Sequence, residues 1–440
     1  MQANPLGLVF FPAFDWAISP THPEREERLL YTRDQLVEEG LLDIPGIHEY
    51  KPRLATVRDV ERVHLAVPDV SSLITDAHLI SAGGAITAAE AVLKGEVQRA
   101  FALVRPPGHH AMRVVHGARG FCTINIEAIM IEYVRRHLGV GRVAIVDTDV
   151  HHGDGTQDIY YHDPDTLFIS FHQDGRTLYP GSGFTQELGS PQALGTTINI
   201  PLPPGTTDEG LHYVLDELVL PVLDEFAPDI IINSAGQDNH YSDPLAGMAI
   251  TAQGYARLAD KLKADIAVLE GGYSIETALP YVNTGIILAM AGLDYSKVIE
   301  PDCKAAPMTR AANTAIIQSI VAEQKNMWLR RNELKSKALT QAGEYWERER
   351  NIYYDSSEIM EEQVEYLRLC PECQGFMTVK TQSNGQHSSY KSAFAAVIPR
   401  QPCRRCREQA KEAVETEKRR GGFQQYILQD RENDVVERFF

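Results

Sequence analysis

The chain has 440 residues, and its 42 Lys and Arg against 60 Asp and Glu give a formal net charge of −18 at pH 7. This excess of negative charge argues against non-specific nucleic-acid binding by the chain as a whole. The length favours one large domain, or one large domain with an appendage. Residues 301–440 hold 22 basic against 20 acidic side chains, so the excess lies in residues 1–300, where it either attracts a cationic substrate or forms a solvated surface.

The N-terminal stretch and the cysteines indicate an intracellular protein. The segment MQANPLGLVFFPAFDW lacks the basic residues that precede the apolar run of a secretory signal. No apolar run approaches the roughly 18 residues of a membrane span. Four of the six cysteines form two Cys-x-x-Cys pairs, which is more typical of an intracellular metal site than of a disulfide framework. We therefore expect a cytoplasmic protein that does not associate with a membrane.

Apolar segments of strand length recur along the first 300 residues. In chain order they are 6–11, 100–104, 142–147, 166–171, 229–235 and 265–270. Their nearly continuous Val, Ile, Leu, Phe and Ala are typical of strands buried on both faces of a parallel sheet. Helical patterns lie between them, at 208–226 and 251–263. Strands alternating with helices predict an α/β fold with a doubly wound, mostly parallel sheet flanked by helices.

The pattern changes after about residue 300, and we place a domain boundary near Pro301. Residues 309–349 predict one or two long polar helices, and residues 408–422 predict a helix closed by glycines. The two Cys-x-x-Cys pairs lie between these helices. The sequence thus predicts a main domain, residues 1–300, and a helical C-terminal extension, residues 301–440, with a zinc-ribbon-like module at about 366–410.

Polar residues follow four of the apolar segments directly. The segment RPPGHH follows 100–104, DTDVHHGDG begins at Asp147, GQDNHYSDP follows 229–235, and GGYS follows 265–270. In an open parallel sheet, ligands bind in the crevice outside the carboxyl ends of the strands. One such segment is usually an ordinary polar loop, but four of them predict a shared site.

The segment DTDVHHGDG predicts a metal site. In an extended chain, Asp147, Asp149 and His151 lie on one side of the backbone. Asp243, after another strand, is the best candidate for a further carboxylate ligand. An Asp–His–Asp set leaves one coordination position open, as a catalytic metal requires; zinc fits, and mixed oxygen and nitrogen ligands also suit ferrous iron or cobalt. The alternative is a salt-bridged loop around a strand end.

Six segments in this order carry a resemblance to a known family. They are RPPGHH, GFCTIN, DTDVHHGDG, SFHQDGRTLYPGSG, SDPLAGM and EGGY. Through them, roughly residues 5–295 resemble the zinc-dependent histone deacetylase family, which includes bacterial acetylpolyamine amidohydrolases and acetoin-utilisation-type proteins. The resemblance implies an arginase/deacetylase-like fold and an amidohydrolase activity.

The resemblance also implies roles for individual residues. It assigns to the catalytic zinc Asp149, His151 and Asp243; to catalysis His109, His110, their carboxylate partners Asp147 and Asp154, and Tyr273; to a potassium ion Asp147, Asp149, His151, Ser170 and Phe171; and to the wall of an acyl-lysine tunnel Phe121 and Tyr179. Without the resemblance, the paired histidines would be interpreted as an ordinary loop and the aromatic residues as part of the core.

These residue types suit the hydrolysis of an amide. A metal ion polarises the acyl oxygen and makes bound water acidic. By the resemblance, His110 with Asp154 takes the proton from water and later protonates the leaving amine. His109 with Asp147 gives electrostatic support. Tyr273 donates a hydrogen bond to the developing oxyanion.

The sequence therefore predicts a zinc-dependent deacetylase that removes an acetyl or related acyl group from lysine in a protein or from a polyamine. Two alternatives stay open: an arginase-like ureohydrolase with two metal ions, and a catalytically silent protein that binds acyl-lysine. The first needs more bridging carboxylates and histidines than we find. The presence of both histidines and of the tyrosine argues against the second.

Four cysteines in the extension predict a second, structural zinc ion. Cys370, Cys373, Cys403 and Cys406 offer the closed Cys₄ arrangement of such a site. The 29 residues between the pairs exceed the usual spacing of a zinc ribbon, and the alternative is two reduced pairs without metal. The arginine-rich segment CRRCREQ supports nucleic-acid binding only weakly. The extension has three candidate roles: to pair two chains as a homo-oligomer, to shape the site entrance or to recruit a partner.

Overall fold

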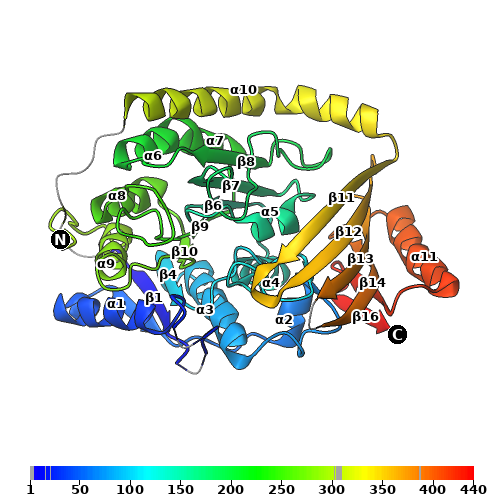
Figure 1. Ribbon diagram of the computed structural model, residues 1–440, viewed down its shortest axis with the longest axis horizontal. Coiled ribbons are helices and arrows are strands. Elements are labelled where there is room, and N and C mark those ends of the chain that lie inside the picture. The colour runs from blue at the N-terminus through cyan, green and yellow to red at the C-terminus, as the bar shows by residue number, and fades with distance from the viewer. Residues whose placement is uncertain (1–3, 15, 20, 302, 304–309, 386–387) are drawn as a thin grey trace.

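The computed structural model describes residues 4–14, 16–19, 21–301, 303, 310–385 and 388–440. These residues build two large sheets, one in the main domain and one in the extension, and the second packs against one side of the first domain (Figure 1). A small two-stranded sheet joins β3 (Leu65–Ala66) to β5 (Val114–Val115).

The main domain contains an eight-stranded sheet in which every neighbouring pair is parallel. Its order is β2 (Ile47–Tyr50), β1 (Leu6–Phe11), β4 (Arg99–Val104), β10 (Ile266–Val268), β9 (Ile230–Ser234), β6 (Val143–Asp147), β7 (Thr166–Gln173) and β8 (Thr197–Leu202). All six predicted strands are present. The two that were not predicted, β2 and β8, are the edges of the sheet.

Helices cover both faces of this sheet. One face carries α1 (Glu27–Glu38), α6 (Asp208–Val214), α7 (Leu220–Phe226), α8 (Ala252–Leu262) and α9 (Leu279–Met290), and the other carries α3 (Asp76–Leu93) and α4 (Ile126–His137). Two shorter helices are α2 (Val57–Glu61) and α5 (Asp154–Tyr160). The predicted helix 208–226 is present as α6 and α7 joined by a π-helical turn, η2 (Leu215–Val219). The doubly wound α/β prediction is confirmed.

A single long helix, α10 (Ala311–Ala342), follows the main domain (Figure 1). Its buried residues Ile317, Val321 and Trp328 join the apolar cluster of the main sheet. The helical prediction for 309–349 extended too far, because a strand begins at Tyr345; residue 309 itself lies outside the described residues. Within the described ranges, no helix is both long and apolar enough to cross a bilayer.

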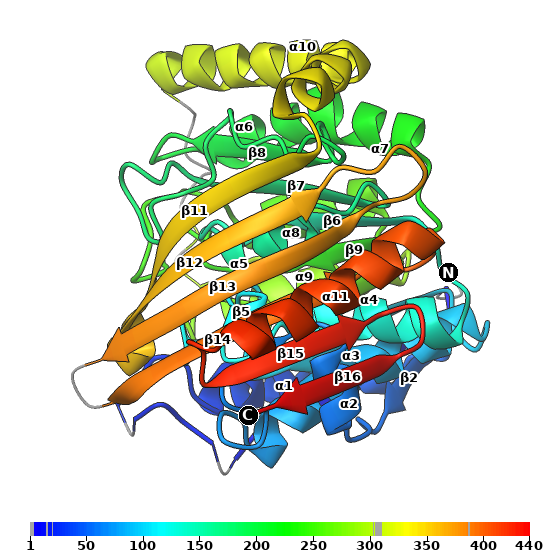
Figure 2. The ribbon, with the colours of Figure 1, turned by 90° about the vertical axis from the view of Figure 1, so that its right-hand side faces the viewer.

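The rest of the extension is a six-stranded sheet, which the prediction of a helical extension missed. Its order is β11 (Tyr345–Tyr354), β12 (Ile359–Arg368), β13 (Phe376–Gly385), β14 (Ser388–Ile398), β15 (Gln425–Asp430) and β16 (Val435–Phe439). Only β14 and β15 pair in parallel, and they are connected through α11 (Arg404–Arg420). Figure 2 shows α11 lying across the outer face of this sheet.

The strands of this sheet were missed because part of their buried face is polar. On β12, Glu361, Gln363 and Glu365 point toward the main domain and are at most 2% exposed. A carboxylate oxygen of Glu365 lies 2.6 Å from Arg348, which also reaches Asp158 of α5 at 3.1 Å. Polar or charged residues at every second position look like the solvent side of a strand, although here they are paired and covered.

Candidate active site

The four strands whose ends carry polar segments are neighbours in the main sheet, in the order β4–β10–β9–β6. Their carboxyl-end loops surround a cavity of about 250 Å³. It is lined by Pro107, His109, His110, Gly120, Phe121, His151, Leu178, Tyr179, Leu245, Gly271, Tyr273 and Asp355. The predicted convergence of the strand ends is therefore present in the structure.

Asp149, His151 and Asp238 form a buried cluster at this crevice. One ligand atom from each lies within 4.8 Å of the others. His151 Nδ1 lies 3.1 Å from Asp149 Oδ1 and 3.0 Å from Asp238 Oδ2. Two buried carboxylates that both contact His151 need a compensating cation. A set of two carboxylate oxygens and one imidazole nitrogen therefore fits a divalent metal with an open coordination position.

The third carboxylate of this cluster is Asp238, which corrects the prediction of Asp243. Both follow β9, but Asp238 stands four residues after the strand and belongs to the cluster, whereas Asp243, nine residues after the strand, does not. Asp243 instead accepts hydrogen bonds from the backbone N–H groups of Tyr273, at 2.7 Å, and Ser274, at 3.2 Å. Distance from the strand end would have favoured Asp238 in the sequence.

Each of the paired histidines is hydrogen-bonded to a carboxylate. His109 Nδ1 lies 3.2 Å from Asp147 Oδ2, and His110 Nδ1 lies 2.8 Å from Asp154 Oδ1. Burial and the charge of His109 lower the pKa of His110 despite the bond to Asp154. Burial also lowers the pKa of His109, but Asp149 and Asp147 outweigh it and raise the pKa above its ordinary value. The lowered pKa of His110 favours its neutral form, which can accept a proton.

Tyr273 lines the cavity opposite these histidines. Its ring packs edge-on against Phe121, with the centroids 5.7 Å apart, and beneath the guanidinium group of Arg28 at 5.0 Å. Gly271 lets the backbone that precedes Tyr273 come close to Asp238, because a Cβ at position 271 would lie 2.3 Å from a carboxylate oxygen of Asp238. The Gly271 N–H donates to Asp149 Oδ2 at 2.8 Å, so this loop is fixed to the carboxylate cluster.

The remaining predicted site residues also lie near the crevice. Phe121 and Tyr179 are both on the cavity wall. Asp147 and Ser170 are register partners on β6 and β7, and Ser170 Oγ is 2.8 Å from His172 Nδ1. The potassium ion that the resemblance implies at this position stays a prediction.

One cavity residue comes from the extension and was not predicted. Asp355 lies in the short helical turn η3 (Asp355–Ser357) between β11 and β12. Its Oδ1 accepts hydrogen bonds from the Tyr179 hydroxyl at 2.9 Å and from the Gly120 N–H at 3.0 Å. No local pattern could have identified Asp355, because its partners lie about 180 and 235 residues earlier in the chain.

The four cysteines of the extension converge at one end of its sheet. Cys370 and Cys373 lie between β12 and β13, and Cys403 and Cys406 lie at the start of α11. The Sγ atoms of Cys370 and Cys403 are 3.8 Å apart, far beyond disulfide length but close to the separation of about 3.8 Å that Zn–S bonds of about 2.3 Å give in a tetrahedron. Backbone N–H groups donate to three of the sulfurs, those of Cys370, Cys373 and Cys403. The geometry fits the predicted Cys₄ zinc site.

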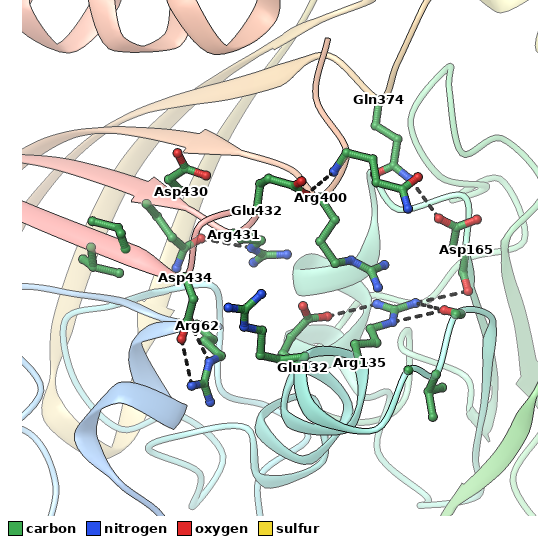
Figure 3. A pocket seen from close by; sticks show the side chains of 18 of the residues that line it. Arg62, Glu132, Arg135, Asp165, Gln374, Arg400, Asp430, Arg431, Glu432 and Asp434 are labelled. Carbon is green, nitrogen blue, oxygen red and sulfur yellow. Dashed lines mark hydrogen bonds and ion pairs between the residues drawn. The ribbon is translucent and has the colours of Figure 1, made fainter. Parts of the chain in front are cut away.

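A larger cleft of about 430 Å³ lies between the end of α4 and the extension (Figure 3). Several of its charged groups pair with one another. Arg135 binds Glu132 at 2.9 Å, and Arg62 binds Asp434 at 2.8 Å. The second pair joins the main domain to the extension, so this cleft contributes to the interface between the two parts.

Comparison with known proteins identifies the family. The family model described as "Histone deacetylase domain" matches residues 68–289. The chain belongs to the histone deacetylase family. A probable deacetylase of Archaeoglobus fulgidus is 49% identical over 311 residues, which are 64% of this chain and 85% of the relative.

Two further relatives agree with this assignment. An acetylpolyamine amidohydrolase of Burkholderia pseudomallei is 41% identical over 203 residues, which are 45% of this chain and 58% of the relative. Among solved structures, the HD domain of HDA15 has a TM-score of 0.64 and 27% identity, and covers 77% of this chain and 99% of its own. Membership in the histone deacetylase family supports a metal-dependent hydrolase activity on an acetylated amine.

Proposed function

We propose that this histone deacetylase family member is a zinc-dependent amidohydrolase that removes an acetyl or related acyl group from lysine in a protein or from a polyamine. The observation that carries the proposal is the cavity itself. His109, His110, His151 and Tyr273 line the same cavity of about 250 Å³, and each of the three histidines is hydrogen-bonded to a buried carboxylate. A cavity of this volume with a mainly apolar lining suits an acyl group on a long amine side chain.

Asp149, His151 and Asp238 would hold the metal ion, with ferrous iron or cobalt as alternatives to zinc. When bound, the ion supplies a Lewis acid for the acyl oxygen and lowers the pKa of water. A potassium ion near Asp147 and Ser170 would add a fixed positive charge beside these carboxylates.

The proton steps belong to residues of this chain. His110 takes the proton from the attacking water at Nε2, while Asp154 holds its Nδ1, and His110 later returns a proton to the leaving nitrogen. His109, charged beside Asp147, stabilises the negative charge that develops. Tyr273 donates its hydroxyl hydrogen to the acyl oxygen as that oxygen becomes negative.

A panel of substrates tests this proposal. Purified protein is incubated with an acetyl-lysine peptide, an acetylpolyamine and longer acyl-lysine peptides, and the release of each carboxylic acid is measured. We expect release from at least one of them. Release of urea from arginine would support the arginase-like alternative, and binding of acyl-lysine without release would support a silent binding protein.

A further inference from the structure

The turn between β11 and β12 lies against the loop that forms one wall of the cavity. This loop, residues 117–121, receives three contacts from the turn and the end of β11. Ser357 Oγ accepts from the Ala118 N–H at 2.9 Å, and Asp355 Oδ1 accepts from the Gly120 N–H at 3.0 Å. Between them, the Arg119 guanidinium donates to the carbonyl oxygen of Tyr353 at 2.8 Å.

The turn is held in this position by apolar packing. Ile352, Tyr354 and Ile359 form a buried cluster with Met112 of the main domain. The Tyr354 hydroxyl donates to the carbonyl oxygen of Val114 at 2.8 Å. A contact that is both buried and hydrogen-bonded can fix a neighbouring loop to within a fraction of an ångström.

Two series of side-chain contacts run from the turn to His110. In the first, Tyr353 holds Arg119, whose other nitrogen pairs with Asp154, and Asp154 binds His110 Nδ1. In the second, Asp355 binds the Tyr179 hydroxyl. The Tyr179 ring lies edge-on to the ring of His110, at 5.2 Å between centroids. The first series of contacts therefore ends at His110 Nδ1, and the second ends at the His110 ring.

We propose that the C-terminal extension completes the active site, with Asp355 as a positioning residue for the cavity wall at Tyr179 and Gly120. This proposal rests on the function proposed above. The extension acts through the turn: it holds the wall at the width that the acyl group needs and keeps Arg119 and Asp154 in place behind His110. Displacement of positioning groups by about 1 Å can cost up to roughly 10² in rate.

Three variants test this role. Asp355→Ala should lower kcat/KM about 10- to 100-fold with metal content and melting temperature unchanged. Asp355→Asn should recover much of the loss, because its amide oxygen still accepts a hydrogen bond. Glu358→Gln removes a charge from the exposed side of the same turn and should behave as wild type. An Asp355→Ala enzyme within twofold of wild type would overturn the proposal.

A double-mutant cycle separates positioning from a general loss of structure. Tyr179→Phe should lower kcat/KM in the wild-type background and have little further effect in Asp355→Ala, because both changes break the same bond. Independent, multiplying effects would contradict the assigned contact.

Hydrogen exchange gives a measure that does not depend on turnover. The Gly120 amide should exchange faster in Asp355→Ala and at the wild-type rate in Glu358→Gln. Unchanged exchange at Gly120 would overturn the positioning role even in an active enzyme. If the wild-type protein shows no turnover, the proposed function fails, whereas faster exchange would still support the contact.

Discussion

The eight-stranded sheet and the six-stranded sheet bury their strands in different chemical ways. Strands such as β6 and β10 of the main domain are almost wholly apolar and lie between two layers of helices. The six-stranded sheet is apolar under α11, but β12 presents Glu361, Gln363 and Glu365 to the main domain. Helices of the main domain cover both faces of the first sheet, whereas the second sheet packs one face against the main domain, through an apolar cluster and through the ion pairs of β12.

The largest expected effect that separates the two sheets is the loss of the Cys₄ metal. The double variant Cys370→Ser, Cys373→Ser should lose about one equivalent of metal per chain, and with it a metal-binding free energy on the order of 10 kcal/mol. Proteolysis should then cleave more readily after residue 344, while the main domain keeps its metal. Cys303→Ser, outside the cluster, is the matched control. The same metal content in the wild type, the double variant and Cys303→Ser would show that the four cysteines hold no metal.

Within the main domain, substitution of the two aspartates after β9 should have sharply different effects on metal content and turnover. Asp238→Asn should lose the catalytic metal and at least about 10³-fold in turnover, because a ligand is removed. Asp243→Asn should keep the metal and lose less than about tenfold, because its amide oxygen still accepts from the Tyr273 N–H. Metal analysis and turnover of the matched pair decide between them. If Asp243→Asn lost the metal and Asp238→Asn kept it, the prediction of Asp243 as the third metal ligand would be restored.

Removing the Tyr273 hydroxyl should affect rate but not structure. Tyr273→Phe should bind metal normally and lose about 10²–10³ in turnover, the usual cost of one oxyanion donor. Tyr281→Phe on α9, away from the cavity, serves as the control. Steady-state kinetics with full metal loading make the comparison, and equal rates in the two variants would refute the role of Tyr273.

The smallest effect concerns Glu361 in the polar interface of the second sheet. Burial raises the pKa of Glu361 from 4.5 to about 7, despite its hydrogen bonds with Thr381, Tyr354 and Gln363. The folded state therefore keeps a proton that the unfolded state releases above pH 4.5, so this group lowers stability as pH rises toward 7. Glu361→Gln should be more stable than wild type, with an advantage that grows by about 1 kcal/mol between pH 6 and pH 8.5.

Denaturant unfolding at these two pH values measures this difference. Glu362→Gln, on the exposed side of the same strand, is the control and should show no change in advantage with pH. A constant difference between Glu361→Gln and wild type would mean that Glu361 does not titrate in this range.

The sequence alone predicted the parts of the molecule whose chemistry is local. Apolar strands, the residues that follow them and the cysteine pairs can all be recognised within short windows. The sheet of the extension could not be recognised in this way, because Glu361 and Glu365 are buried only through partners such as Arg348 and Tyr354 on another strand. The choice of Asp243 over Asp238 failed for a related reason: five residues of loop geometry decide which carboxylate faces His151. Asp355 depends entirely on the tertiary structure.

The most direct test of the account is turnover in metal-free protein. The central claim is that one ion at Asp149, His151 and Asp238 is required for hydrolysis of an acylated amine. The protein is treated with a chelator, assayed for acid release, and assayed again after addition of Zn²⁺, Co²⁺ or Fe²⁺. We predict that chelation abolishes turnover, that one of these ions restores it in wild type, and that none restores it in Asp238→Asn. Full turnover in rigorously metal-free protein would contradict the claim.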